Sequence, residues 1–217
     1  MSGMVWTDII VVVAAYLLGC LQTGYYLVRA LTGQDLRRIG SGSTGARNVE
    51  RVLGRKGFAI TMLGDVGKGA LAVAVAGWML GSPWAVGAAV VAVAVGHVWP
   101  VQLGFSGGRG VAVGMGALVV YEPSLLGVLL VATPLMSLVI RNFHASGLMG
   151  FVVVPLAAWY YRLPCETLAS VGCLSAIVLF AHRSHIVRWL QPAPKQHSEG
   201  ETKAGGPENE SYAIQDR

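Results

Sequence analysis

The sequence predicts an all-α integral membrane protein that crosses the bilayer about seven times. Residues of the set AVILMFWYC make up 54% of the 217 residues, and charged residues only 12%, about half the usual share of a soluble domain. The mean hydropathy is +0.58. A further observation is a series of apolar runs that are long enough, or nearly long enough, to span a bilayer as helices. This composition excludes an ordinary soluble domain and also a disordered chain.

The first apolar run, residues 5–28, begins near the N-terminus without a basic segment before it. It is too long for the core of a signal peptide, so we expect it to be retained as the first span. The other runs cover residues 57–80, 84–103, 111–120, 124–140, 145–161 and 167–181. The run 111–120 is short, so it is either a tilted or half-buried helix or one that begins near Gly108. A model with five spans is the main alternative.

Basic residues indicate how these spans are oriented. All but two of the 16 Lys and Arg residues fall in the odd-numbered connections or the C-terminal tail. They are Arg29, Arg37, Arg38, Arg47, Arg51, Arg55, Lys56, Arg109, Arg141, Arg183, Arg188, Lys195, Lys203 and Arg217. Because positive residues gather in cytoplasmic loops, we expect the N-terminus outside and the C-terminus in the cytoplasm. The same bias accounts for the net charge of +5, so nucleic acid is not an expected partner.

The chain divides into two parts by composition. Residues 1–190 are predicted to form the transmembrane domain. Residues 191–217 combine Pro and Gly with Lys, Glu, Gln and Asn and have no apolar face to bury, which is typical of a disordered cytoplasmic tail.

Three polar clusters lie on the predicted cytoplasmic side, and the first follows the first span. It comprises Gly40, Ser41, Gly42, Ser43, Thr44, Gly45, Ala46, Arg47, Asn48, Val49, Glu50 and Arg51. Small residues allow backbone N–H groups to approach an anion closely. If the segment after Gly45 is helical, Arg47 and Arg51 lie one turn apart and can reach the same phosphate. The alternative is a flexible loop that carries cytoplasmic charges.

The second cluster separates the third and fourth apolar runs. It comprises Gly96, His97, Val98, Trp99 and Pro100, followed by Phe105, Ser106, Gly107, Gly108, Arg109 and Gly110. Glycines and an arginine at the start of a helix make an anion cradle. The alternative is a tight turn, in which Arg109 marks the cytoplasmic face and His97 forms an interhelical hydrogen bond.

The third cluster ends the last apolar run, with His182, Arg183, Ser184, His185 and Arg188. His182 and His185 share a helical face, but no carboxylate or Cys accompanies them on that turn, so we predict no metal site. The alternative to substrate binding is a basic helix end that is stabilised by the macrodipole and by anionic lipid.

Asp65 and Lys68 lie within the second apolar run. Charges inside a membrane are costly and usually face the protein interior. At a spacing of three residues these two can pair with each other, and the face that carries them is expected to turn towards the active cleft.

Read together, these clusters make the chain resemble the PlsY-type bacterial glycerol-3-phosphate acyltransferases, which are integral membrane enzymes that use acyl-phosphate. The resemblance covers residues 16–190. The shared pieces come in the family's order: Tyr16 to Gly19, Gly40-Ser41-Gly42, Gly45-Ala46, Asn48-Val49, Arg51, Asp65, Lys68-Gly69, Gly96-His97, Pro100, Phe105, Gly107-Gly108, Gly110 to Ala112, His182-Arg183, Ile186 and Arg188.

The chain also departs from the family pattern at five positions. Ser43 replaces the usual Asn, Arg47 replaces Thr, and Arg109 replaces the Lys of the Gly-Gly-Lys-Gly motif. In the last motif, Ala181 and His185 replace an Arg and an Asn. Charge is kept at Arg109, although the geometry changes from a point donor to a planar fork.

The resemblance implies transfer of a fatty acyl group from acyl-phosphate to the 1-hydroxyl of sn-glycerol 3-phosphate. It implies direct attack without a cofactor or a metal, at the cytoplasmic face of the bacterial inner membrane, with an enzyme that forms acyl-phosphate as the functional partner. The catalytic residues implied are Ser41, Arg51, Arg109 and His182. The substrate-binding residues implied are Gly40, Gly42, Ser43, Gly45, Asn48, Lys68, His97, Gly107, Gly108, Gly110, Arg183 and His185. The alternatives are a transporter of an anionic metabolite and a non-catalytic lipid-regulatory relative.

Overall fold

The computed structural model describes residues 6–190, except for the side chains at positions 143, 144, 185 and 188–190. Within this part the chain is helical and contains no strand. The α-helices are α1 (Trp6–Cys20), α2 (Thr23–Thr32), α3 (Ala46–Met79), α4 (Pro83–Val98), α5 (Val111–Tyr121), α6 (Pro123–Ile140), α7 (Phe143–Tyr160), α8 (Cys165–Ala181) and α9 (Arg183–Leu190). Two short 3₁₀ helices, η1 (Leu36–Arg38) and η2 (Val101–Leu103), lie in the connections after α2 and α4. The predicted tail, residues 191–217, lies outside the described residues.

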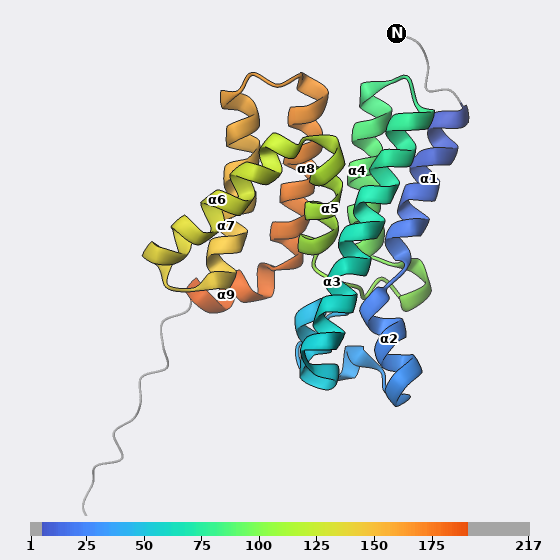
Figure 1. Ribbon diagram of the computed structural model, residues 1–217, viewed down its shortest axis with the longest axis vertical. Helices are drawn as coiled ribbons and strands as arrows, with labels where there is room; N and C mark the ends of the chain where they lie inside the picture. Colours follow the sequence, from blue (N-terminus) through green and yellow to red (C-terminus); the bar gives the residue numbers. More distant parts are fainter. Residues whose placement is uncertain (1–5, 191–217) are drawn as a thin grey trace, which may run out of the picture.

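The long helices run back and forth between two ends of the molecule (Figure 1). The connections from α2 to α3, from α4 to α5 and from α8 to α9 all lie at the end drawn lowest, and the turns after α3, α5 and α7 lie at the opposite end. Four helical segments are long and apolar enough to cross a membrane: Trp6–Thr32, Ala46–Met79, Pro83–Leu103 and Pro123–Ile140. Three shorter apolar helices cover Val111–Tyr121, Ala145–Tyr160 and Cys165–Ala181.

Three boundaries differ from those predicted. The first apolar run is broken between α1 and α2 at Leu21 and Gln22. Helix α3 begins at Ala46, well before the apolar run at 57–80, and is kinked at Gly54, where φ is 63° and ψ is −162°. Helix α5 begins at Val111 rather than near Gly108, because Gly110 precedes it with φ of 84°, a left-handed conformation that an α-helix cannot contain.

Small residues let the helices approach closely. A Cβ added at Gly19 of α1 would overlap the carbonyl oxygen of Val93 on α4, and one at Gly96 of α4 would overlap the carbonyl oxygen of Tyr16 on α1. Helices α3 and α5 approach in the same way: a Cβ at Gly69 of α3 would overlap the carbonyl oxygen of Val113, and one at Gly116 of α5 would overlap that of Val66. Close backbone approach through small residues is typical of packing between membrane helices, where burial from water supplies little driving force.

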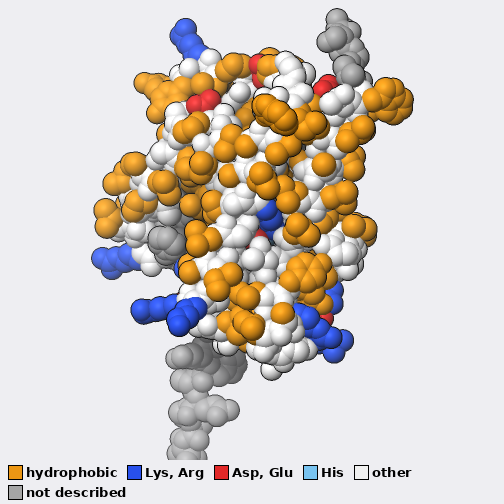
Figure 2. All heavy atoms as spheres, turned by 45° about the vertical axis from the view of Figure 1, so that its right-hand side comes forward, with side chains coloured by type: hydrophobic (Ala, Val, Ile, Leu, Met, Phe, Trp, Pro, Cys, Tyr) orange, Lys and Arg blue, Asp and Glu red, His pale blue; other side chains and the backbone are white. Residues whose placement is uncertain are grey.

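Large apolar side chains cover the outside of the bundle (Figure 2). Those left exposed include Ile10, Leu63, Trp78, Leu138 and Trp159. In Figure 2 most of the visible Lys and Arg side chains gather towards the end that also carries the connections from α2 to α3 and from α8 to α9. An apolar flank with basic residues at one end is the surface expected of a protein surrounded by lipid.

Candidate active site

The three polar clusters lie together at one end of the bundle. The backbone N–H of Thr44 donates to the carbonyl oxygen of Gly107 over 3.3 Å, which joins the first cluster to the second. The second cluster also packs close to the third: a Cβ at Gly110 would lie 3.1 Å from Cγ2 of Val178. Val178 is on α8, one helical turn before His182. The rings of Trp99 and Phe180 are also in contact, with centroids 5.9 Å apart. The structure therefore brings the beginnings of α3, α5 and α9 to one place.

We call residues 40–45 the first glycine loop, and the buried side chain of Asn48 holds it in shape. The Nδ2 of Asn48 donates to the carbonyl oxygens of Leu36, Ile39 and Ser43 at 3.2, 2.9 and 2.9 Å, and its Oδ1 accepts the N–H of Ser41 at 3.1 Å. Its hydrogen bonds are thus made within the chain. Asn48 therefore supports the loop from beneath, whereas the sequence analysis assigned it to substrate binding.

The outer side of the first glycine loop carries exposed polar groups. Ser41, Arg47 and Arg51 are exposed, and Arg51 lies against the loop: a Cβ at Gly40 would be 2.7 Å from its Nη1. Gly40 and Gly42 have φ of 55° and 70°, a region that glycine tolerates best. Gly45 is the N-cap of α3, and no side chain there accepts a hydrogen bond from the backbone N–H groups of the first turn. Arg47 and Arg51 lie on the first two turns of the same helix. Such a helix start favours an anion.

We call residues 104–110 the second glycine loop, which packs directly on His97. The N–H groups of Gly107 and Gly108 donate to the carbonyl oxygens of Val98 and His97 at 3.2 and 2.9 Å. A Cβ at Gly108 would overlap the imidazole ring of His97, and one at Gly107 would overlap the His97 carbonyl oxygen. These glycines are therefore required for packing as much as for access to a ligand. Arg109 follows, half-buried, just before α5.

His182 follows α8 directly and is buried. Its Nδ1 lies 2.8 Å from the carbonyl oxygen of Val178, the residue that packs on Gly110 of the second glycine loop. Since a carbonyl oxygen only accepts, Nδ1 is the donor in this contact. Arg183 is exposed and stacks its guanidinium on Phe180, 4.4 Å from the ring centroid. The side chain of His185 lies outside the described residues.

Asp65 and Lys68 form the ion pair that their spacing indicates, with 3.0 Å between Lys68 Nζ and Asp65 Oδ1. Both are buried. Lys68 also donates to the carbonyl oxygen of Leu21 at 2.5 Å, and Asp65 accepts from Thr23 at 3.3 Å, so the pair spans the break between α1 and α2. His97 Nδ1 lies 3.8 Å from Asp65 Oδ1. In this arrangement Lys68 stabilises a helix break, although the sequence analysis assigned it to substrate binding.

Gln22 and Thr44 are buried residues for which no site role was predicted, although Thr44 belongs to the first polar cluster. The Nε2 of Gln22 donates to the carbonyl oxygens of Gly19 and His97 at 3.2 and 3.1 Å, and its Oε1 accepts the Thr44 hydroxyl at 2.6 Å. A glutamine inside an apolar run was the available signal, since a buried amide needs several partners.

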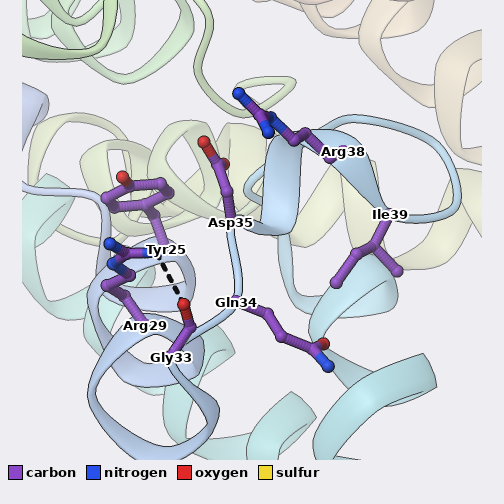
Figure 3. Close-up of a pocket in the computed structure, with 7 residues that line it drawn as sticks. All are labelled: Tyr25, Arg29, Gly33, Gln34, Asp35, Arg38 and Ile39. Atoms are coloured by element: carbon purple, nitrogen blue, oxygen red, sulfur yellow. Dashed lines mark hydrogen bonds between the residues drawn. The ribbon is translucent and has the colours of Figure 1, made fainter.

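A pocket of about 630 Å³ opens beside the first glycine loop and not in it (Figure 3). It is lined by Tyr25, Arg29, Gly33, Gln34, Asp35, Arg38 and Ile39, and Arg29 donates to the carbonyl oxygen of Gly33 across 2.6 Å. None of these residues was predicted as a site residue. A smaller pocket of about 260 Å³ lies between the two glycine loops, lined by Asp35, Arg37, Arg38, Gly42 and Ser106.

Within the described part of the chain, no three residues of the types His, Cys, Asp and Glu lie close enough to hold a metal ion.

Three comparisons with known proteins agree. The family model described as glycerol-3-phosphate acyltransferase matches residues 9–192. A glycerol-3-phosphate acyltransferase 1 from Desulfitobacterium hafniense is 37% identical over 195 residues, which is 90% of this chain and 96% of that protein. One from Thermosynechococcus vestitus is 38% identical over 190 residues, covering 81% of this chain and 88% of that protein.

Two solved structures also share the fold. The crystal structure of PlsY (YgiH), an integral membrane glycerol 3-phosphate acyltransferase, in its glycerol 3-phosphate form superposes with a TM-score of 0.77 at 30% identity. That match covers 84% of this chain and 92% of the other. The lysophosphatidic acid form gives a TM-score of 0.76 at 28% identity, covering 84% and 91%.

Proposed function

This chain belongs to the glycerol-3-phosphate acyltransferase family, and from this membership we propose that it transfers the acyl group of an acyl-phosphate to the 1-hydroxyl of sn-glycerol 3-phosphate. The protein is a membrane acyltransferase that acts on glycerol 3-phosphate. The acyl-phosphate donor, the site residues and the side of the membrane are the finer parts of the proposal.

The observation that carries the proposal is the meeting of two glycine loops through the contact between Thr44 and Gly107. Each loop leads into a helix without a side-chain cap, at Gly45 and at Gly110, and each has an arginine beside it, Arg51 or Arg109. Both proposed substrates carry a phosphate. The starts of α3 and α5 each combine helix N–H groups with an arginine, which is an arrangement that favours an anion. Two such starts side by side would bind two phosphates close together.

In this proposal the protein orients two reactants and neutralises charge. The 1-hydroxyl oxygen attacks the acyl carbonyl carbon, the bond from that carbon to the phosphate oxygen breaks, and inorganic phosphate leaves. The hydroxyl proton passes to a substrate phosphate oxygen. An acyl-phosphate is already an activated mixed anhydride, so orientation and charge stabilisation supply the rate without a covalent intermediate.

The roles follow from where the groups lie. Ser41 and the N–H groups of the first glycine loop would bind one phosphate, together with Arg51. Arg109 and the start of α5 would stabilise the charge that develops on the leaving phosphate. His182 would orient the glycerol 3-phosphate from the end of α8. Gly108 and His97 would give the second glycine loop its shape.

We also propose the placement in the cell. The helices cross the inner membrane of a bacterium seven times, with the N-terminus outside and this end of the bundle in the cytoplasm, where both phosphorylated substrates are found. The acyl chain enters from the bilayer between helices. An enzyme that makes acyl-phosphate is the required supplier of the donor.

The test is the stoichiometry of turnover by the purified protein in detergent. Given acyl-phosphate and labelled glycerol 3-phosphate, it should release one inorganic phosphate for each 1-acyl-glycerol 3-phosphate formed. Phosphate release without the acyl product, or acyl product without phosphate, would refute the proposal.

A further inference from the structure

Arg37 lies between the two glycine loops and contacts three separate elements. Its Nη1 donates to the carbonyl oxygen of Leu103, the last residue of η2, over 2.9 Å. Its Nε and Nη2 donate to the two carboxylate oxygens of Asp35 at 3.0 and 2.7 Å. Its guanidinium also lies 5.3 Å from the centroid of the Tyr25 ring on α2. One side chain thus connects α2, the segment before the first glycine loop and the segment before the second.

The pair formed by Arg37 and Asp35 has a fixed geometry. A bidentate contact between guanidinium and carboxylate sets the orientation of both groups. Asp35 also accepts the backbone N–H of Arg37 at 3.0 Å, which caps η1. The hydrogen bonds from Arg37 lower the pKa of Asp35 to about 2, so the carboxylate stays ionised throughout the neutral range. Both members of the pair are therefore charged at neutral pH.

The contact with Leu103 connects the two 3₁₀ helices that lead into the glycine loops. The loops themselves meet where Thr44 donates to Gly107, and Gln22 relates Thr44 to the end of α4, on which the second loop packs. Arg37 adds a contact between η1 and η2, next to the 260 Å³ pocket whose lining includes Gly42 and Ser106. This further attachment restrains the relative orientation of the segments from which both loops start.

We propose that Arg37 is a positioning residue, held by Asp35, that sets the distance and angle between the two glycine loops. This inference rests on the proposed function, because it assumes that the loops bind the phosphates of the two reactants. Arg37 itself does not touch the reacting atoms. Its loss should lower kcat by about 10- to 100-fold, since small errors in the placement of reactants reduce rates by such factors.

The experiment compares Arg37→Ala and Arg37→Lys with Arg55→Ala. Arg55 is the control, because it carries the same charge, is exposed and lines neither pocket. Two quantities are measured on the full-length protein in detergent: hydrogen exchange of the amides in residues 101–108, and kcat with acyl-phosphate and glycerol 3-phosphate. The lysine variant keeps the charge but cannot bind Asp35 through two nitrogens and still reach Leu103.

The proposal predicts faster exchange in residues 101–108 and a lower kcat for both Arg37 variants, with Arg55→Ala like the wild type in both. Full rescue by Arg37→Lys would overturn it, because charge alone would then suffice. Unchanged exchange, or faster exchange with an unchanged kcat, would also overturn it. If the wild-type protein fails to use acyl-phosphate, the proposed function fails, while the exchange measurement still decides whether Arg37 connects the loops.

Discussion

The backbone N–H of Thr44 donates a hydrogen bond of 3.3 Å to the carbonyl oxygen of Gly107. The hydroxyl of Thr44 donates at the same time to Gln22, whose amide also binds the carbonyl oxygen of His97 at 3.1 Å. One buried glutamine therefore relates the first glycine loop to the end of α4, on which the second glycine loop packs. The geometry of the candidate site depends on a residue that lies outside it.

Gln22→Leu should lower both stability and activity. It removes the donor to the carbonyl oxygen of Gly19 and the acceptor of the Thr44 hydroxyl. The carbonyl oxygen of His97 also loses the Gln22 amide and keeps the N–H of Gly108. Unsatisfied buried polar groups cost about 1–3 kcal/mol, so the unfolding temperature in detergent should fall and turnover with it. Gln34→Leu is the control, since Gln34 is exposed. Equal stability of Gln22→Leu and the wild type would contradict this interpretation.

Gly108→Ala should disturb the second glycine loop. The new methyl group would overlap the His97 ring, and the ring is buried, so either the loop or the histidine must move. Overpacking of this kind typically costs about 1–3 kcal/mol. Thermal unfolding and turnover should both decrease. Gly127→Ala on α6 is the comparison, because a Cβ there meets nothing within 4 Å. A fully active and stable Gly108→Ala protein would show that the contact with His97 is not needed.

Arg109→Ala should abolish most activity while the protein remains in the membrane. Arg109 precedes α5, where the uncapped helix start and an arginine side chain would both stabilise negative charge on the leaving phosphate. Losing such a group costs about 2–4 kcal/mol, or about two to three decades in rate. Arg109→Lys should keep much of the activity because it keeps the cation. Initial rates with saturating substrates provide the measurement.

If the Arg109→Ala protein is folded and nearly fully active, the second glycine loop is only a turn and has no catalytic role. The phosphates would then have to be held by Arg51 and His182, together with the first glycine loop.

The helical class and most of the helix boundaries could be predicted from apolar runs, but the break at Leu21 and Gln22 could not. No Pro or Gly marks these two positions. The break is stabilised by distant partners: Lys68 binds the carbonyl oxygen of Leu21, and Gln22 binds that of His97. Local sequence does not contain such tertiary contacts, so the run reads as one helix. The start of α3 at Ala46 lies outside the apolar run because its first turns are polar, and a helix after Gly45 was only one of two interpretations of that segment.

For the candidate site, the sequence indicated segments that lie together in the structure but not which partners each side chain takes. Glycines, hydroxyls and arginines pointed to residues 40–51, 96–110 and 182–188, and the structure brings the described parts of these segments together. It turns Asn48 inwards to hold the first glycine loop and directs Lys68 to the carbonyl oxygen of Leu21. Whether a polar side chain faces a ligand or the chain itself depends on packing, which spacing along the sequence does not determine.

The orientation can be checked with reporters fused at two places. Ser82 lies in the turn between α3 and α4, at the end opposite the candidate site, and Lys195 follows α9 in the sequence. A reporter at Ser82 should read external and one after Lys195 cytoplasmic, as the distribution of Lys and Arg predicts. Opposite readings at both positions would place the three clusters on the wrong side of the membrane for their substrates.

The most direct test of the account is a comparison of two acyl donors with one preparation of purified protein. The candidate site offers glycine loops and arginines that suit small phosphates, so acyl-phosphate should support acylation of labelled glycerol 3-phosphate. Acyl-CoA at the same concentration should give no product above background. Formation of 1-acyl-glycerol 3-phosphate from acyl-phosphate alone is the predicted result. Efficient turnover with acyl-CoA, or none with acyl-phosphate, would contradict the account.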